Sequence, residues 1–380
     1  VGRDVRLVVR VPPGLLRPAL AGIVPYEPGK PIEEVQRELG LERVVKLASN
    51  EGPYGPFPRA LEALERAEAE LNRYPDGGAY RLRTALAELH GVEFDEVAVG
   101  SGADAIIDGL SQAVLEPDNN VVHGWPSFPS YAIYARKLGA QAVQVPLRDY
   151  RYDLDALLDA VTERTKLVYV CHPNNPTGTM NSRAELDAYF ERIPDHVLTV
   201  LDQAYFEYID DPDYADGIKD YFKAGRRVLV LRTFSKIYGL AGLRVGYGVG
   251  PAEVVTALGK TRRAFDLTTP AQEAALASLD FPGELERRRR INAEGLSELV
   301  RLLTEAGYGV VGPAVGNFVF VDLGEDAQPW FEVLLREGVI VRPLAAFGAP
   351  DAIRITVGTH AEHEFLAEAL ARVRTAAAAS

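Results

Sequence analysis

The sequence predicts an α/β protein with a large domain on a mostly parallel sheet flanked by helices, and a smaller α+β domain. Short β-branched segments alternate with helical segments through the middle of the chain, and several are apolar at almost every position. Strands that alternate with helices form parallel sheets covered on both faces, so their residues are apolar throughout. After about residue 270 this alternation ends. We expect an N-terminal arm with part of the small domain over 1–45, the large domain over 46–270 and the small C-terminal domain over 271–380.

The N-terminal third begins with a segment rich in proline and glycine and continues with two amphipathic helices. Proline and glycine recur through residues 1–30, which predicts an extended arm. Leucines at helical spacing predict helices over 58–71 and 79–90. Gly91 follows the second as a C-terminal cap.

The middle and the end of the chain differ in the order of their elements. We expect strands over 96–99, 120–123, 166–171, 196–201, 227–231 and 243–249, with helices over 103–115, 130–138, 153–160 and 182–193. Helices over 271–280 and 284–306 and strands over 317–322 and 339–342 then form the small domain. A last helix begins at Thr359, which has capping-box spacing to Glu362.

Composition excludes several classes of function. The 380 residues include 41 basic and 54 acidic side chains, giving a formal net charge of −13. Phosphate backbones and anionic membranes repel such a chain, so we expect no nucleic-acid or membrane partner. A single cysteine, Cys171, excludes an intrachain disulfide and a multi-cysteine metal site. No leader pattern and no apolar run of about 18 residues is present, so we expect a cytoplasmic protein. We also expect no bound metal.

Polar residues follow four of the predicted strands where those strands end. These segments are Ser101–Asp104, His172–Gly178, Asp202–Tyr205 and Thr233–Lys236. Open α/β sheets bind ligands beyond the carboxyl ends of their strands, so the segments should line one crevice. Taken singly, each has an ordinary structural explanation as a turn, a helix cap or a surface charge.

Taken together, these residues match the chemical needs of pyridoxal 5′-phosphate. A lysine forms an imine with this cofactor, and a carboxylate beside the pyridine nitrogen makes the ring an electron sink. The phosphate group needs a helix N-terminus, a small hydroxyl and an arginine. Lys236, Asp202, Ser235, Arg244 and the helix that starts at Ala103 supply these parts on successive strands.

The chain resembles the fold-type I pyridoxal-phosphate-dependent aminotransferases, and within them the histidinol-phosphate aminotransferase family. The resemblance extends from about Pro25 to Val373. Its matching segments are Lys46–Glu51, Pro53–Pro56, Pro173–Gly178, Asp202–Tyr205, Thr233–Lys236, Gly242–Tyr247, Val341–Pro343 and Arg354–Thr359. It implies that the segment over 46–270 is the cofactor-binding domain.

The resemblance implies roles for individual residues at the cofactor. Lys236 would hold the cofactor as a Schiff base and move the proton between Cα and C4′, and Asp202 would pair with the pyridine nitrogen. Asn175 and Tyr205 would hold the 3-hydroxyl group, with Lys236, Asp202 and Tyr205 forming the catalytic set. Phe128 would stack on the ring. The phosphate group would be held by Ala103, Asp104, Ser235 and Arg244.

Further residues would bind the substrate or come from a second subunit. Arg354 would bind the carboxylate of glutamate or 2-oxoglutarate, and Arg342 the phosphate of L-histidinol phosphate, with Asn175 also on the substrate side. Tyr26 would cover the imidazole from the arm. Tyr54 would reach the phosphate of the partner's cofactor, which implies a homodimer. The reaction implied is the transfer of the amino group of L-histidinol phosphate to 2-oxoglutarate in histidine biosynthesis.

The chain departs from the family pattern at three positions near the expected site. Ala105 stands where an acidic residue is usual, and Asp266 and Thr268 lie in the segment Phe265–Thr268, where a Tyr-Asn-x-Asn stretch is usual. These changes bear on the substrate more than on the reaction. An aromatic amino-acid aminotransferase and a decarboxylase of phosphorylated amino acids therefore stay open as alternatives on this scaffold.

Two alternatives from other classes are less consistent with the residues. A non-catalytic regulator or binding module on this fold should lack the lysine or its aspartate, and this chain has both. The glycine pattern over 100–105 fits a dinucleotide fingerprint, but an NAD-dependent enzyme would leave the lysine, aspartate and asparagine segments unexplained.

Two charged groups are interpreted as surface features. The four consecutive arginines Arg287–Arg290 spread around a predicted helix and are expected to form a solvated face. His360 and His363 are expected at the surface of the last helix, because nothing nearby suggests a metal ligand.

Overall fold

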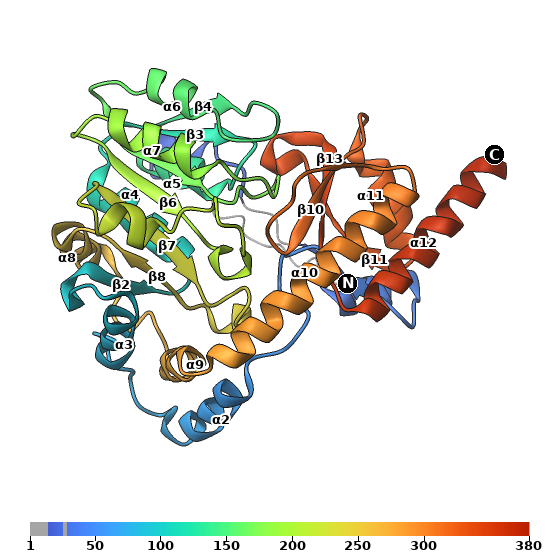
Figure 1. Cartoon of the computed structure of the whole chain (residues 1–380), viewed down its shortest axis with the longest axis horizontal. Coiled ribbons are helices and arrows are strands. Elements are labelled where there is room, and N and C mark those ends of the chain that lie inside the picture. Colours follow the sequence, from blue (N-terminus) through green and yellow to red (C-terminus); the bar gives the residue numbers. More distant parts are fainter. Residues whose placement is uncertain (1–13, 26–28, 380) are drawn as a thin grey trace, which may run out of the picture.

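A seven-stranded sheet forms the centre of the larger part of the molecule (Figure 1). The computed structural model describes residues 14–25 and 29–379. The strands lie in the order β2-β8-β7-β6-β5-β3-β4. Their bounds are β2 (Val97–Gly100), β8 (Gly246–Val249), β7 (Val228–Thr233), β6 (Leu198–Asp202), β5 (Thr165–Cys171), β3 (Asn120–Trp125) and β4 (Gln141–Pro146). Only β8 runs antiparallel to its neighbours, so the predicted mostly parallel sheet is confirmed.

Helices flank this sheet because the connections between parallel strands must cross its faces. The central strands β5, β6 and β7 are almost wholly buried, as their apolar sequences require. The helices of this part are α2 (Pro58–Ala67), α3 (Tyr80–His90), α4 (Ala103–Val114), α5 (Ser130–Leu138), α6 (Leu154–Asp159), α7 (Arg183–Arg192), α8 (Ala252–Thr261) and α9 (Thr269–Leu279).

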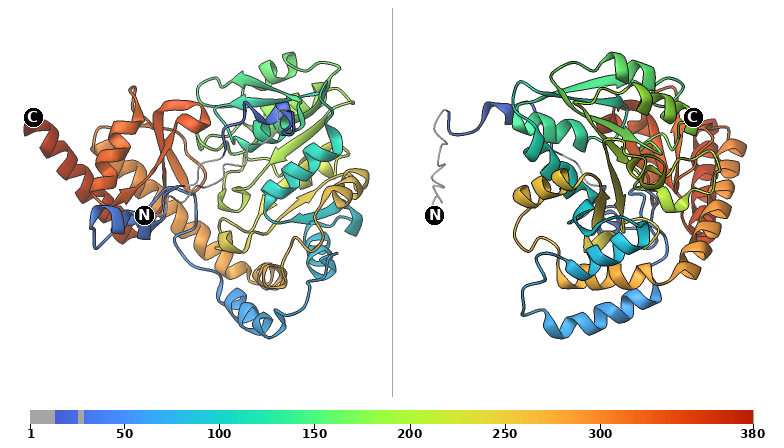
Figure 2. Two further views of the ribbon diagram at one scale, coloured as in Figure 1. Left: turned by 180° about the vertical axis from the view of Figure 1, so that it is seen from behind. Right: turned by 60° about the vertical axis from the view of Figure 1, so that its left-hand side comes forward.

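The smaller part contains a four-stranded antiparallel sheet with its own hydrophobic core. The sheet has the order β12-β13-β10-β9, with β12 (Arg342–Leu344), β13 (Ala349–Thr356), β10 (Phe318–Asp322) and β9 (Gly309–Val311). It packs with α10 (Pro282–Glu305), α11 (Ala327–Arg336) and α12 (His360–Ala379). The left view in Figure 2 shows this part beside the larger one, and Figure 1 shows α10 extending between them.

The N-terminal segment pairs with the smaller part. Strand β1 (Val45–Lys46) pairs in parallel with β11 (Val339–Ile340), and α1 (Ile32–Leu39) packs nearby through Val35. Short helical turns complete the structure: 3-10 helices over Pro18–Leu20, Glu68–Glu70, Phe94–Glu96, Phe206–Tyr208, Ala241–Leu243 and Ala345–Phe347, and a π-helix over Gly217–Phe222.

The predicted start of the last helix is confirmed by its capping bonds. The backbone N–H of Thr359 donates to the Glu362 carboxylate at 2.7 Å, and the N–H of Glu362 donates to the Thr359 hydroxyl at 3.3 Å. Across residues 14–25 and 29–379, none of the helices combines the length and the apolar character needed to cross a bilayer.

The expected solvated face of arginines is wrong for Arg288, which is only 6% exposed. Its guanidinium donates to the carbonyl oxygens of Gly55 at 2.6 Å and Ile237 at 3.1 Å, and it pairs with Glu284 at 2.9 Å. The helix face that carries Arg288 meets two loops of the larger part, so burial is offset by these hydrogen bonds.

The expectation that both histidines of the last helix lie at the surface is wrong for His363, which is fully buried. Its Nδ1 lies 2.9 Å from a Glu298 carboxylate oxygen, and its Nε2 accepts the N–H of Gly358 at 2.9 Å. These partners satisfy both ring nitrogens without a metal, while His360 is exposed as expected.

Candidate functional site

A cavity of about 150 Å³ lies at the carboxyl ends of β5, β6 and β7. Parallel strands place these ends at one edge of the sheet, which brings distant segments of the sequence together. All the residues assigned to cofactor binding within one chain line this cavity: Ala103, Asp104, Phe128, Asn175, Asp202, Tyr205, Ser235, Lys236 and Arg244. Cys171, the buried last residue of β5, also lines it.

Lys236 lies in the loop after β7, part-buried inside this cavity. Its Nζ lies 3.5 Å from the carbonyl oxygen of Ser49 and 5.4 Å from the centre of the Tyr205 ring. Burial and, to a smaller extent, the positive charge of Arg354 lower the pKa of the amine, Glu51 and Asp202 act in the opposite direction, and the net result is a pKa of about 7. A lysine with such a pKa is available as a neutral nucleophile near neutral pH.

Asp202 is the buried last residue of β6. The hydroxyl of Tyr131 donates to one of its carboxylate oxygens at 2.6 Å, and the N–H of Ala204 donates to the other at 3.1 Å. Burial raises the pKa of this carboxyl group, and both hydrogen bonds oppose the rise by stabilising the charged form. Tyr131 was given no role from its sequence, and no local pattern marks it as the partner of Asp202.

Tyr131 is fixed by its surroundings. It is completely buried, and its ring stacks on that of Tyr169 with centroids 4.4 Å apart. Burial raises the pKa of its hydroxyl far above the ordinary tyrosine value, so this group stays protonated and donates to Asp202.

An anion-binding cradle lies where α4 begins. Gly102 has φ +82°, and a Cβ at this position would lie 2.5 Å from Nη2 of Arg244, so the guanidinium packs directly over the glycine backbone. Nη1 of Arg244 donates to the Ser235 hydroxyl at 3.3 Å. A helix N-terminus, a hydroxyl and a guanidinium together suit a phosphate group. In Asp104 one carboxylate oxygen is buried with no hydrogen-bond partner in the described part of the chain.

Asn175 and Tyr205 line the same cavity, and each is held by a neighbour. Nη1 of Arg354 donates to the side-chain oxygen of Asn175, and Nη2 donates to the carbonyl oxygen of Ala48 at 2.8 Å. The amide of Asn50 donates to the Tyr205 hydroxyl at 2.9 Å. Asn50 lies in a segment that carried the resemblance, but it was given no role there.

Of the other assigned residues, Arg342, Arg354 and Tyr54 do not line this cavity. Arg342 is buried on β12 beside Arg354, and Tyr26 falls outside the described residues. Tyr54 lines a separate small cavity of its own chain with Tyr208 and Ile237. The single chain therefore assembles the cofactor-binding residues without Tyr54.

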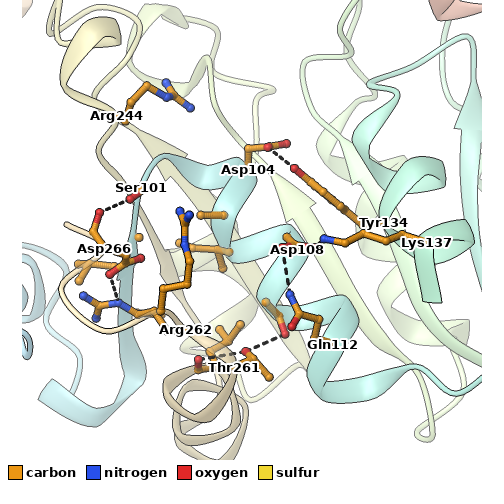
Figure 3. A pocket seen from close by; sticks show the side chains of 18 residues that line it. Ser101, Asp104, Asp108, Gln112, Tyr134, Lys137, Arg244, Thr261, Arg262 and Asp266 are labelled. Carbon is orange, nitrogen blue, oxygen red and sulfur yellow. Dashed lines mark hydrogen bonds and ion pairs between the residues drawn. The ribbon is translucent and has the colours of Figure 1, made fainter. Parts of the chain in front are cut away.

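A larger cavity of about 710 Å³ adjoins the cradle and shares Asp104 and Arg244 with it (Figure 3). Two of the three unusual positions line it, Ala105 and Asp266. The Asp266 carboxylate pairs with Nε of Arg262 at 2.5 Å, and its carbonyl oxygen accepts the Ser101 hydroxyl. Thr268 caps α9 by accepting the N–H of Ala271 at 3.3 Å. Both Asp266 and Thr268 are thus engaged in local structure.

The residues of the cavity fit pyridoxal 5′-phosphate by their donor chemistry. The cradle suits the phosphate group, Asp202 suits a protonated pyridine nitrogen, and Lys236 suits the aldehyde carbon. The glycine backbone beneath Arg244 leaves the anion site free of a Cβ. Fold and site together define a fold-type I pyridoxal-phosphate-dependent transferase.

Comparison with known proteins gives the family. The model of the aminotransferase class I and II family matches residues 42–370. The chain belongs to this family. It is 45% identical over 365 residues to histidinol-phosphate aminotransferase 2 of Pseudomonas fluorescens, covering 94% of this chain and 97% of the relative. It is 44% identical to histidinol-phosphate aminotransferase of Moorella thermoacetica, covering 94% of this chain and 92% of the relative.

Solved structures agree with this assignment. Histidinol-phosphate aminotransferase from Sinorhizobium meliloti, crystallised in complex with pyridoxal 5′-phosphate, matches with a TM-score of 0.86 at 29% identity, covering 95% of this chain and 97% of that one. A double mutant of Thermus thermophilus aspartate aminotransferase matches with a TM-score of 0.81 at 27% identity, covering 94% and 98%. The fold class and the family predicted from the sequence are confirmed.

Proposed function

We propose that this protein uses pyridoxal 5′-phosphate to transfer the amino group of L-histidinol phosphate to 2-oxoglutarate, giving imidazole-acetol phosphate and L-glutamate in histidine biosynthesis. The observation that carries the proposal is the meeting of Lys236, Asp202 and the Arg244–Ser235 cradle in one cavity. The names of relatives with 45% and 44% identity support the choice of substrate.

Each residue of the cavity has a task in this reaction. When bound, pyridoxal 5′-phosphate supplies an electron sink for the electrons left on Cα of the amino substrate. The carboxylate of Asp202 favours a proton on the pyridine nitrogen, which strengthens that sink. Lys236, once its amine is free and neutral, takes the proton from Cα and returns it at C4′. Asn175 and Tyr205, which line the cavity, would orient the ring through its 3-hydroxyl group.

Two arginines recognise the acidic groups of the substrates. Arg354 binds the carboxylate of 2-oxoglutarate, and Arg342 the phosphate of L-histidinol phosphate. Guanidinium groups suit both tasks because they present a planar fork of donors. The contact of Arg354 with Asn175 supports this placement, since Asn175 lines the cavity.

The attachment of the cofactor to the cofactor-free protein is expected to depend on pH through Lys236. Its pKa of about 7 means that the amine is a non-nucleophilic ammonium below that pH and neutral above it. The rate of attachment, followed by visible absorbance in a stopped-flow instrument, should rise about tenfold per pH unit below 7 and level off above it. A rate that continues to rise tenfold per unit between pH 8 and 10 would show an ordinary lysine pKa and contradict this prediction.

Replacing Tyr131 with phenylalanine is expected to lower kcat about tenfold or more, because a hydrogen bond to a charged group contributes about 1.5–3 kcal/mol. The loss of this donor should raise the pKa of Asp202 and weaken its hold on the protonated ring nitrogen. The pH titration of the visible absorbance should shift. The variant Tyr169→Phe removes a neighbouring buried hydroxyl that does not contact Asp202, and it should leave the titration unchanged.

A substrate comparison tests the proposal directly. The purified protein should show kcat/KM for L-histidinol phosphate at least about tenfold above that for phenylalanine, with 2-oxoglutarate as acceptor. A clear preference for phenylalanine would overturn the substrate and favour the aromatic aminotransferase. Decarboxylation without transfer of an amino group, or a colourless protein that binds no pyridoxal 5′-phosphate, would overturn the reaction itself.

We also propose that the protein is a cytoplasmic homodimer with a tyrosine from each subunit at the partner's phosphate group. Tyr54 is the residue proposed for this role; within its own chain it lines a small cavity, and its backbone carbonyl oxygen lies 3.4 Å from Nη1 of Arg288. Tyr74, which stacks on Phe265 with centroids 4.6 Å apart and is 81% exposed, has no assigned role and serves as the control.

Cofactor affinity distinguishes the two tyrosines. Light scattering should give twice the monomer mass for the parent protein. The variant Tyr54→Phe should release pyridoxal 5′-phosphate faster than the parent on dilution, whereas Tyr74→Phe should retain it. A monomeric active protein, or two variants that both retain the cofactor like the parent, would overturn the shared site.

A further inference from the structure

Two buried arginines face each other across neighbouring strands of the smaller sheet. Arg342 of β12 and Arg354 of β13 are direct partners in the antiparallel pairing, and they are 8% and 4% exposed. Side chains of directly opposed residues lie on the same face, and like charges at such positions destabilise a sheet. The fold therefore holds two guanidinium groups together where their mutual repulsion is strong.

One aromatic ring lies close to both cations. The centroid of the Phe347 ring is 5.5 Å from Cζ of Arg342 and 5.4 Å from Cζ of Arg354. Phe347 is 1% exposed, so the contact occurs away from water. The face of an aromatic ring carries negative charge and attracts cations, most strongly when they are desolvated.

The backbone around Phe347 fixes this ring in place. Phe347 ends the short helix Ala345–Phe347, which connects β12 to β13, and Gly348 follows it with φ +88°. A Cβ on Gly348 would lie 2.1 Å from Nε1 of Trp125, so the turn is pressed against the end of β3 in the larger part. The ring position is thus set from both parts of the molecule.

We propose that Phe347 is a positioning residue that sets both anion-binding guanidinium groups, so that one ring controls affinity for the phosphorylated amine and for the dicarboxylate acceptor. This inference rests on the proposed function for the identity of the two substrates. Phe347 itself touches neither of them. Its effect on binding passes through the orientation of Arg342 and Arg354.

The variant Phe347→Leu keeps an apolar side chain and removes the ring. We expect KM for L-histidinol phosphate and KM for 2-oxoglutarate each to rise about tenfold, with kcat at saturation within about twofold of the parent, because only binding contacts are weakened. The dissociation constant of succinate, a dicarboxylate that cannot react, should rise by a similar factor in calorimetry on the cofactor-loaded protein. The variant Phe347→Tyr keeps the ring face and should restore parental values.

Leu344→Ala is the matched control. Leu344 is fully buried in the same hydrophobic cluster as Phe347, so its truncation loosens the packing without removing a ring from the guanidinium groups. Unchanged KM values and succinate affinity in Phe347→Leu, or an equal rise in Leu344→Ala, would overturn the inference. If the parent protein does not turn over L-histidinol phosphate, the proposed function fails, while succinate binding still tests the role of Phe347.

Discussion

Replacing Lys236 with alanine is expected to lower the rate of transamination by about 10⁴-fold or more, because the variant loses its covalent nucleophile and its proton carrier in one change. No other lysine lines the cavity within residues 14–25 and 29–379. The visible absorbance of the lysine-bound cofactor should also disappear. Single-turnover measurements with L-histidinol phosphate and absorbance spectra test both effects.

Lys260→Ala is the control for this experiment. Lys260 is exposed near the end of α8 and does not line the cavity, so its loss should change neither rate nor spectrum. The far-ultraviolet circular dichroism of Lys236→Ala should match that of the parent, since the side chain is not part of the apolar core. Transamination at the parent's rate by Lys236→Ala would refute the assignment of the nucleophile.

The second large effect is expected for Asp202→Asn, which should lower kcat by about 10²- to 10³-fold. Asparagine keeps the shape of the side chain but removes the charge that holds a proton on the pyridine nitrogen, and loss of such electrostatic stabilisation has this order of magnitude. The folded protein should not lose stability, because a buried carboxylate costs more to desolvate than an amide.

The visible absorption spectrum distinguishes Asp202→Asn from Lys236→Ala. Asp202→Asn retains Lys236 and the cradle of Ser235 and Arg244, so it should keep a lysine-bound, visibly absorbing cofactor whose pH titration is altered. The control is Asp210→Asn, which changes an exposed aspartate further along the chain and should behave like the parent. A parental kcat in Asp202→Asn would contradict the role given to the carboxylate.

The sequence could predict which residues follow the ends of strands. It could not predict which side chains of other elements contact those residues. The apolar strands and the polar segments after them predicted the positions of Asn175, Asp202 and Lys236. This was possible because an apolar run and the polar residues that follow it can be seen within one short stretch of sequence. The bond from Tyr131 to Asp202 was not foreseen, since it depends on how α5 packs over β6. No pattern within α5 marks one of its tyrosines as the partner of a buried carboxylate.

Elements with weak periodicity were missed for related reasons. Strand β4 is largely part-exposed, so it lacks the continuous apolar run of the central strands. Strand β13 begins with Ala349-Pro-Asp351, which is typical of a turn, although it carries Arg354 further along. Whether an arginine on a helix is exposed or buried depends on what packs against that face of the helix. The burial of Arg288 could therefore not be predicted from the run of four arginines.

Arg288 also makes the position of the nucleophile sensitive to the long helix α10. Its nitrogens bond to carbonyl oxygens on two loops, including that of Ile237, the residue after Lys236. A lysine at this position has one nitrogen and cannot span the same set of acceptors. Through these hydrogen bonds, α10 connects the smaller part of the molecule to the backbone beside Lys236.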